Sequence, residues 1–396
     1  MKILLRTTPL LLILAIGCTS STKKSSMMLD DSPVVAKIIK SGADDVLIAE
    51  NSLLGKDTLD FPLSALVEDI QVVQLKAFLN GQFAKFAHSE QYILISENDN
   101  YKQVKLFRKD GRLIANIGAI GRGPGEYFAI YDQYIDEANQ RVYLLPWMTS
   151  HLLVYDFQGT YLKSIPTPIL FSKAIFRINP NQTITFIKLP LESDSKNVIW
   201  TQDSTGKMIS YKSLNWHIPS SFDHELSSNK NPDYFDFSFT VSGNEKSDTL
   251  YHYDISKNVV FKRFAMVFHK RPLSYVYSEL LNYYFVTIYK LTYVYGGIQG
   301  VPSQYIAIDK ASHKGSFVKL RNDYLGGIIV PGSISLMFRD GYFTQIIDPA
   351  SLKASLEEVR LTNLDMTQEI KDRVDYLMKT ISYEDNDYII YGRLKK

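Results

Sequence analysis

The fold is decided by residues 103–117, QVKLFRKDGRLIANI, in which two strand-like runs flank a tight turn. Apolar and polar side chains alternate in Gln103–Arg108, as they do in a strand that has one buried face. Asp110-Gly111 supplies the turn, because glycine adopts the positive φ that such turns require without steric cost. Arg112–Ile117 then returns with strand composition. The stretch therefore predicts a β-hairpin.

The same hairpin recurs along the chain. Gln158-Gly159 and Thr205-Gly206 separate further pairs of strand-like runs, so the first three turn glycines lie 48 and 47 residues apart. Less regular copies occupy residues 250–262, 305–320 and 343–348, the last of which leads through residues 349–351 into a helical tail. Repeats of about 40–50 residues that each hold four short strands are typical of propeller blades. Six recurrences predict six blades; a β-sandwich, the alternative, would lack the longer period.

The composition agrees with an all-β body. The 396 residues include 26 Tyr and 21 Phe, and aromatic side chains suit half-buried pleated surfaces. The 44 basic and 42 acidic residues nearly balance, and no basic stripe or block of like charge occurs. Nucleic acid is therefore not indicated as a partner.

The C-terminal residues predict how the ring closes. Residues 367–378, TQEIKDRVDYLM, place Ile370, Val374 and Leu377 on one helical face, with Thr367 as the cap. A polar stretch follows, and residues 388–394, YIIYGRL, then have strand composition. A final strand after a surface helix is what a ring needs if the last segment completes the first blade. We predict a six-bladed β-propeller over residues 61–396, with a short C-terminal helix before the closing strand.

The N-terminal residues predict export. Lys2 and Arg6 precede the apolar run LLLILAI at residues 10–16, which is too short to span a bilayer as a mature anchor. The run ends at Ala15-Ile16-Gly17-Cys18, which resembles a lipobox, and Cys18 is the only cysteine. We predict a signal peptide at residues 1–17, lipid attachment at Cys18, and a tether and leading segment at residues 18–60.

These features make the predicted location the cell envelope, with the acyl chains on Cys18 in the outer membrane and the body on its periplasmic or surface face. An ordinary secretory signal with an incidental cysteine is the alternative. Using Cys18 for the anchor leaves the mature chain without disulfides, zinc–cysteine sites or thiol catalysis.

One loop, residues 117–127, IGAIGRGPGEY, is rich in glycine and follows the first hairpin. It is not a phosphate-binding loop, because Pro124 follows Gly123 where such a loop needs lysine. Two interpretations stay open. The loop is a tight connection between blades that Glu126 and Arg122 brace, or its amides and Arg122 line the mouth of the central channel. Arg122, Glu126 and Tyr127 are the candidate ligand-binding residues.

The Asp-Gly hairpin that ends in Ile-Gly and continues into Gly121–Tyr127, GRGPGEY, resembles the six-bladed β-propeller lipoproteins, an NHL-like family of gut-type Gram-negative bacteria. Residues 64–75, 135–143 and 384–391 resemble that family's opening strand, next blade start and closing strand, with Asp387 where proline is usual. The resemblance implies a fold and an envelope location. It implies no activity, because the family is largely uncharacterised.

The sequence contains no catalytic set. The seven histidines form no His-x-His or His-x-x-x-His pair, and no Gly-x-Ser-x-Gly elbow occurs. We therefore predict no catalytic residue, metal ligand or cofactor. The aromatic-rich residues 275–295 either pack within a blade or form a stacking surface for sugars or peptides.

These observations predict a non-catalytic ligand- or protein-binding module, whose partner is a glycan, a peptide or an envelope protein. The alternative is a propeller hydrolase or lyase with a metal-dependent site in the central channel. A purely structural protein is a third possibility, which a channel plugged by its own side chains would indicate.

Overall fold

The structure is a computed structural model that describes residues 28–79, 84–97, 102–191, 198–214, 224–240, 249–270, 272, 274–294, 297–330 and 337–396. The predicted signal peptide and Cys18 lie outside the described residues. None of the helices in these ranges is long and apolar enough to cross a membrane.

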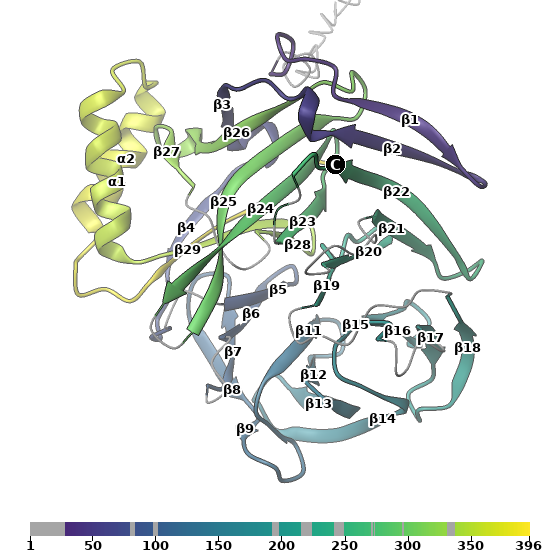
Figure 1. The fold of residues 1–396 in the computed structure, drawn as a ribbon. Helices are drawn as coiled ribbons and strands as arrows, with labels where there is room; N and C mark the ends of the chain where they lie inside the picture. Colours follow the sequence, from purple (N-terminus) through teal and green to yellow (C-terminus); the bar gives the residue numbers. More distant parts are fainter. Residues whose placement is uncertain are drawn as a thin grey trace, which may run out of the picture.

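Six blades, each with four antiparallel strands, surround a common axis, and further strands extend two of them (Figure 1). Three consecutive blades, from inner to outer strand, are β5–β8 (Ala84–His88, Tyr92–Glu97, Val104–Arg108, Leu113–Ile117), β11–β14 (Ile130–Asp136, Arg141–Pro146, Thr149–Asp156, Tyr161–Phe171) and β15–β18 (Ala174–Ile178, Ile184–Lys188, Ile199–Gln202, Met208–Lys212). The next two are β19–β22 (Glu225–Ser227, Phe235–Thr240, Thr249–Asp254, Val259–Val267) and β23–β26 (Ser274–Glu279, Tyr283–Val294, Gly297–Asp309, Gly315–Asn322). The closing blade consists of β28 (Phe338–Arg339), β29 (Tyr342–Ile347), β30 (Tyr388–Arg393) and β4 (Gln71–Gln74). The predicted all-β, six-bladed propeller is confirmed.

The turn glycines of the predicted hairpins also join neighbouring blades. Gly111 connects β7 to β8 at φ +87°, and a Cβ built on it would lie 2.1 Å from the carbonyl oxygen of Gln74 on the outer strand of the closing blade. Gly159 has φ +83° and approaches the carbonyl oxygen of Asn116, on the outer strand of the preceding blade, in the same way. Positive φ and this close approach both require glycine, which explains why the turn repeats in the sequence.

The two ends of the chain meet in the closing blade. β30 pairs with β29 on one side and with β4 on the other, where Ile389 lies opposite Val73. We call the pairing of β30 with β4 the seam. The sixth predicted hairpin is therefore split. Residues 343–347 belong to the second strand, β29, and the third and fourth strands come from opposite ends of the chain. Completion of the ring by the final strand is confirmed.

Two helices stand outside the ring where we predicted one (Figure 1). The predicted helix is α2 (Gln368–Thr380), and the Thr367 side chain caps it by accepting a hydrogen bond from the amide of Ile370. The additional helix is α1 (Pro349–Thr362), whose N-cap Asp348 accepts from the amide of Ser351 at 2.8 Å. Leu352 and Leu356 of α1 are fully buried. Their i, i+4 spacing is the signal that the sequence analysis missed.

Four further strands extend two of the blades. β1 (Ala36–Ser41) and β2 (Asp44–Glu50) form a hairpin that extends the β19–β22 blade, with β2 parallel to β22. β3 (Thr58–Pro62) lies parallel to β26 and, with β27 (Ile328–Ile329), extends the neighbouring blade. Residues 36–62, which include most of the predicted leading segment, therefore pair the outer strands of two blades, which would otherwise be free edges.

The aromatic-rich stretch lies largely in the core between blades. Tyr275, Tyr277, Tyr284 and Tyr289 are buried, and the ring of Tyr284 stacks on that of Phe264 with 4.4 Å between centroids. The side chains of Tyr293 and Tyr295 lie outside the described residues. Within the described part, these aromatic residues pack the blades together.

Candidate functional site

Charged side chains of the inner strands meet on the propeller axis. Asp132 of β11 is fully buried, and its Oδ2 lies 2.8 Å from Lys230 Nζ and accepts a hydrogen bond from the amide of Phe176 at 2.9 Å. Its other oxygen accepts from the Arg339 guanidinium. Burial by itself would raise the pKa of Asp132, but the charges of Lys230 and Arg339 outweigh it and hold the pKa below its usual range.

Lys230 belongs to residues 228–234, which follow inner strand β19 and which we call the axial segment. Its backbone is left-handed, with φ +50°, and Nζ also donates to the carbonyl of Gln133 at 2.9 Å. Burial lowers the pKa of Lys230 to about 8, although Asp132 favours the charged form. The neighbouring Asn229 donates to the carbonyl of Phe338 at 2.7 Å and to Ser278 Oγ at 3.1 Å.

These contacts link the inner parts of the blades across the axis. The β5–β8 blade is connected to this network by the amide of His88, which donates to Asp340 Oδ2 at 3.1 Å. Near the axis, the buried carboxylate of Asp132 thus pairs with the side chains of both Lys230 and Arg339.

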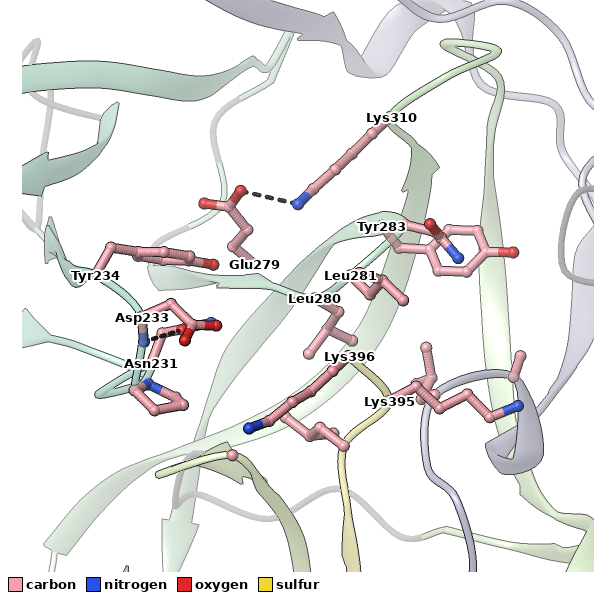
Figure 2. Close-up of a pocket in the computed structure, with 16 residues that line it drawn as sticks. Asn231, Asp233, Tyr234, Glu279, Leu280, Leu281, Tyr283, Lys310, Lys395 and Lys396 are labelled. Carbon is pink, nitrogen blue, oxygen red and sulfur yellow. Dashed lines mark hydrogen bonds and ion pairs between the residues drawn. The ribbon is translucent and has the colours of Figure 1, made fainter. Parts of the chain in front are cut away.

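A pocket of about 240 Å³ opens beside the axial segment (Figure 2). Its walls come from that segment, from turns that follow β23, β25 and β28, and from both sides of the seam. We call it the seam pocket. The residues that line it are Ala65, Leu66, Asn231, Pro232, Asp233, Tyr234, Glu279, Leu280, Leu281, Asn282, Tyr283, Lys310, Gly341, Leu394, Lys395 and Lys396.

One wall of the seam pocket is organised by Glu279. Its Oε2 lies 2.7 Å from His252 Nε2 and its Oε1 lies 2.8 Å from Lys310 Nζ. Burial opposes ionisation, but the hydrogen bond from His252 and the charge of Lys310 outweigh it and lower the pKa of Glu279 to about 2. The ring of Tyr234 stacks on His252, with 3.9 Å between centroids. Both oxygens of this carboxylate are therefore already engaged.

The rest of the pocket combines an apolar surface with a charged rim. Leu66, Leu280 and Tyr283 are buried, whereas Leu281 is about half exposed. Asp233, Lys395 and Lys396 are exposed, and Figure 2 shows Lys396 extending across the pocket toward the side that carries Asp233. Such an arrangement can hold a small molecule that has both an apolar and a charged part.

The predicted ligand-binding residues lie elsewhere, in the loop between β8 and β11. This loop contains the short strands β9 (Ala119–Ile120) and β10 (Glu126–Tyr127) and extends away from the inner strands (Figure 1). Tyr127 is buried, accepts from the amide of Val104 at 2.9 Å and donates to the carbonyl of Ile117. Glu126 accepts from the amide of Gly123 at 2.7 Å, and exposed Arg122 lies 5.5 Å from the ring centroid of Phe128.

The structure thus brings Arg122, Glu126 and Tyr127 together in one connection between blades, and none of them lines the seam pocket. Tyr127 and the carboxylate of Glu126 hold the loop in shape. A role for the three residues in ligand binding stays a prediction.

The histidines are dispersed in the part of the chain that the structure describes. His88 contacts Thr344 Oγ1 at 2.7 Å and stacks on Tyr342, and His252 contacts Glu279 of the pocket wall. His217 lies outside the described residues. In the described ranges, no group of three or more His, Cys, Asp or Glu side chains is placed to hold a metal ion.

The seam pocket is not predictable from the sequence, because its lining comes from short, widely separated segments. None of these segments carries a catalytic or ligand-binding motif. The Asn-Pro-Asp turn at residues 231–233 is a signal for a loop, but it gives no information about where that loop lies.

The sequence matches, over residues 47–393, the family described as "Domain of unknown function (DUF4934)". No curated protein matches it. Among solved structures, a protein from Bacteroides fragilis that is described as exported is similar, with 14% identity and a TM-score of 0.56 over 88% of this chain and 99% of that chain. A duf4221 family member from Bacteroides vulgatus has 13% identity and a TM-score of 0.47, over 83% and 97% of the two chains. The first similarity shows a shared fold.

Proposed function

The chain belongs to the DUF4934 family, a domain of unknown function, and on that premise we propose that it is a non-catalytic binding protein of the cell envelope whose ligand enters the seam pocket. The observation that carries this proposal is the contrast between the axis and the pocket. On the axis, the carboxylate of Asp132 pairs with both Lys230 and Arg339. The seam pocket has open volume and exposed charged side chains.

The chemistry of the pocket supports binding. Glu279, its most buried carboxylate, is held ionised between His252 and Lys310, so it is poorly suited to accept a proton from a substrate near neutral pH. The described part of the channel supplies no arrangement that favours the hydrolase or lyase alternative.

For the location, we propose export followed by lipid attachment to Cys18 and retention at the outer membrane. The charged N-terminus, the apolar run and the lipobox-like residues 15–18 support this proposal. So does the description of the structurally similar Bacteroides fragilis protein as exported.

The binding function is tested by filling the seam pocket. Leu281 lines the pocket and is 51% exposed, so Leu281→Trp adds bulk there without entering the core. Leu361, at the C-terminal end of α1, is 80% exposed, and Leu361→Trp is the matched control. Each protein is incubated with a small-molecule and peptide extract of the cell envelope, and retained compounds are identified by mass spectrometry.

We expect the wild type and the control to retain the same compound or compounds and the Leu281→Trp variant to lose them. Equal retention by all three proteins, or retention by none, would overturn the proposal.

A further inference from the structure

We infer that the seam pocket binds a small aliphatic carboxylate, a ligand whose charged end meets the lysines and whose apolar end meets the leucines. This inference rests on the proposed function and names the ligand class of that same site. The shared chemistry occurs in two sources, a free aliphatic acid and the C-terminal residue of a peptide.

The size of the pocket limits the ligand. Its volume of about 240 Å³ is below the range of about 300–1,000 Å³ that is usual for sites of drug-sized ligands. A group of the size of one amino-acid residue therefore suits it better than an oligosaccharide. Capture of the terminal carboxylate is one of the recurring modes of peptide recognition.

The charge expected of the ligand is inferred from the charged side chains of the pocket and from the partners that they already have. Glu279 is neutralised within the wall, since one oxygen contacts His252 and the other contacts Lys310. Lys310 uses one N–H on Glu279 while its side chain remains 26% exposed, and an ammonium group has three donors. A ligand carboxylate can therefore share Lys310 with Glu279.

Two more ammonium groups, on Lys395 and Lys396, lie at the rim, and the acidic residue there is Asp233. The charged side chains of the lining are three lysines, Asp233 and Glu279. In Figure 2, Lys310 and Lys396 reach the pocket from different sides, and Leu280 and Leu281 lie between them. One negative charge next to an aliphatic group complements this surface.

The test uses three probes with the full chain. N-acetylleucine is an aliphatic carboxylate, and N-acetylleucinamide is its uncharged analogue. Acetyl-Gly-Gly-Leu presents the same carboxylate at the end of a peptide. Ligand-observed NMR titrations give the dissociation constants. Because hydrogen bonds to charged groups are strong, we expect N-acetylleucine to bind about tenfold or more tightly than its amide.

Variants connect the binding to the pocket. Lys396→Gln removes an exposed charge without disturbing the fold and should weaken binding of N-acetylleucine several-fold, whereas Asp233→Asn should leave binding equal or tighter. Lys310→Met should lose most of the binding and Lys310→Arg should retain it. Tighter binding of acetyl-Gly-Gly-Leu than of N-acetylleucine would identify a peptide end as the source, and the reverse order would identify a free acid.

Two results would overturn the inference. The first is equal or tighter binding of the amide, and the second is no binding of any probe by the wild type. Neither result decides the proposed function, which depends separately on whether the Leu281→Trp variant loses compounds that the wild type retains.

Discussion

Lys230 and Asp132 form a buried ion pair on the propeller axis, with 2.8 Å between Nζ and Oδ2 and side chains that are 6% and 0% exposed. Asp132 lies on the inner strand β11, and Lys230 lies in the axial segment two blades further along the ring. Each charge is desolvated, so the pair is stable only because the partners and the hydrogen bonds around them are complete. The axis therefore contributes to stability and to the placement of the axial segment, whose residues 231–234 line the seam pocket.

Replacing Lys230 by methionine should destabilise the protein strongly, because Asp132 would remain buried with Arg339 as its one charged partner. Removing one member of a buried pair costs about 3–5 kcal/mol. Urea unfolding followed by tryptophan fluorescence measures this change. Lys40→Met is the control, since the pair of Lys40 with Asp45 is exposed and should contribute about 0–1 kcal/mol. Equal unfolding midpoints for the two variants would contradict the assignment.

Lowering the pH should reduce the free energy of unfolding of the wild type, partly through Glu279. The pKa of this carboxyl group is lowered from 4.5 to about 2 in the folded chain. A carboxylate with a lowered folded pKa contributes stability that is fully present above the unfolded pKa. That stability is lost as the pH falls from about 4.5 to about 2. The size of this contribution is about 3 kcal/mol. Urea titrations of the wild type and Glu279→Gln between pH 2 and pH 6 should therefore show the smaller pH dependence in the variant. Parallel curves would refute the interpretation.

Gly111→Ala should loosen the contact between the first blade and the closing blade, because the added methyl group would meet the carbonyl oxygen of Gln74. Gly327 has nearly the same φ, +88° against +87°, and no atom within 4 Å of a built Cβ. Gly327→Ala should thus cost only the backbone strain of about 1–2 kcal/mol. We expect thermal unfolding to show a larger loss for Gly111→Ala, and a loss no larger than that of Gly327→Ala would show that the contact is unimportant.

Cys18→Ala should abolish lipid attachment, since Cys18 is the only cysteine of the chain. After expression in a Gram-negative host with an alkyne-bearing fatty acid, the wild type should carry the label and sediment with membranes. The variant should be unlabelled and leave the membrane fraction. Ser20→Ala, which keeps the cysteine, is the control. Label on the variant would show that the lipid is attached elsewhere, and no label on the wild type would favour an ordinary secretory signal at residues 1–18.

The fold was predictable because its signals are local. The turn glycines at 111, 159 and 206, the alternating runs around them and the strand composition of residues 388–394 each lie within a few adjacent residues. The sixth repeat left a weaker signal, because its third and fourth strands, β30 and β4, come from opposite ends of the chain and are not joined by a turn. The additional helix α1 was missed although Leu352 and Leu356 have helical spacing.

The sequence by itself determined a ring of six blades, because turn geometry and side-chain alternation are properties of neighbouring residues and recur with the blade. The tertiary structure alone decided which charges meet on the axis and which residues form the seam pocket. Residues 65–66, 231–234, 279–283 and 394–396 become neighbours only when the ring closes and the inner strands converge. Their proximity depends on packing between blades, which leaves no local pattern in the chain.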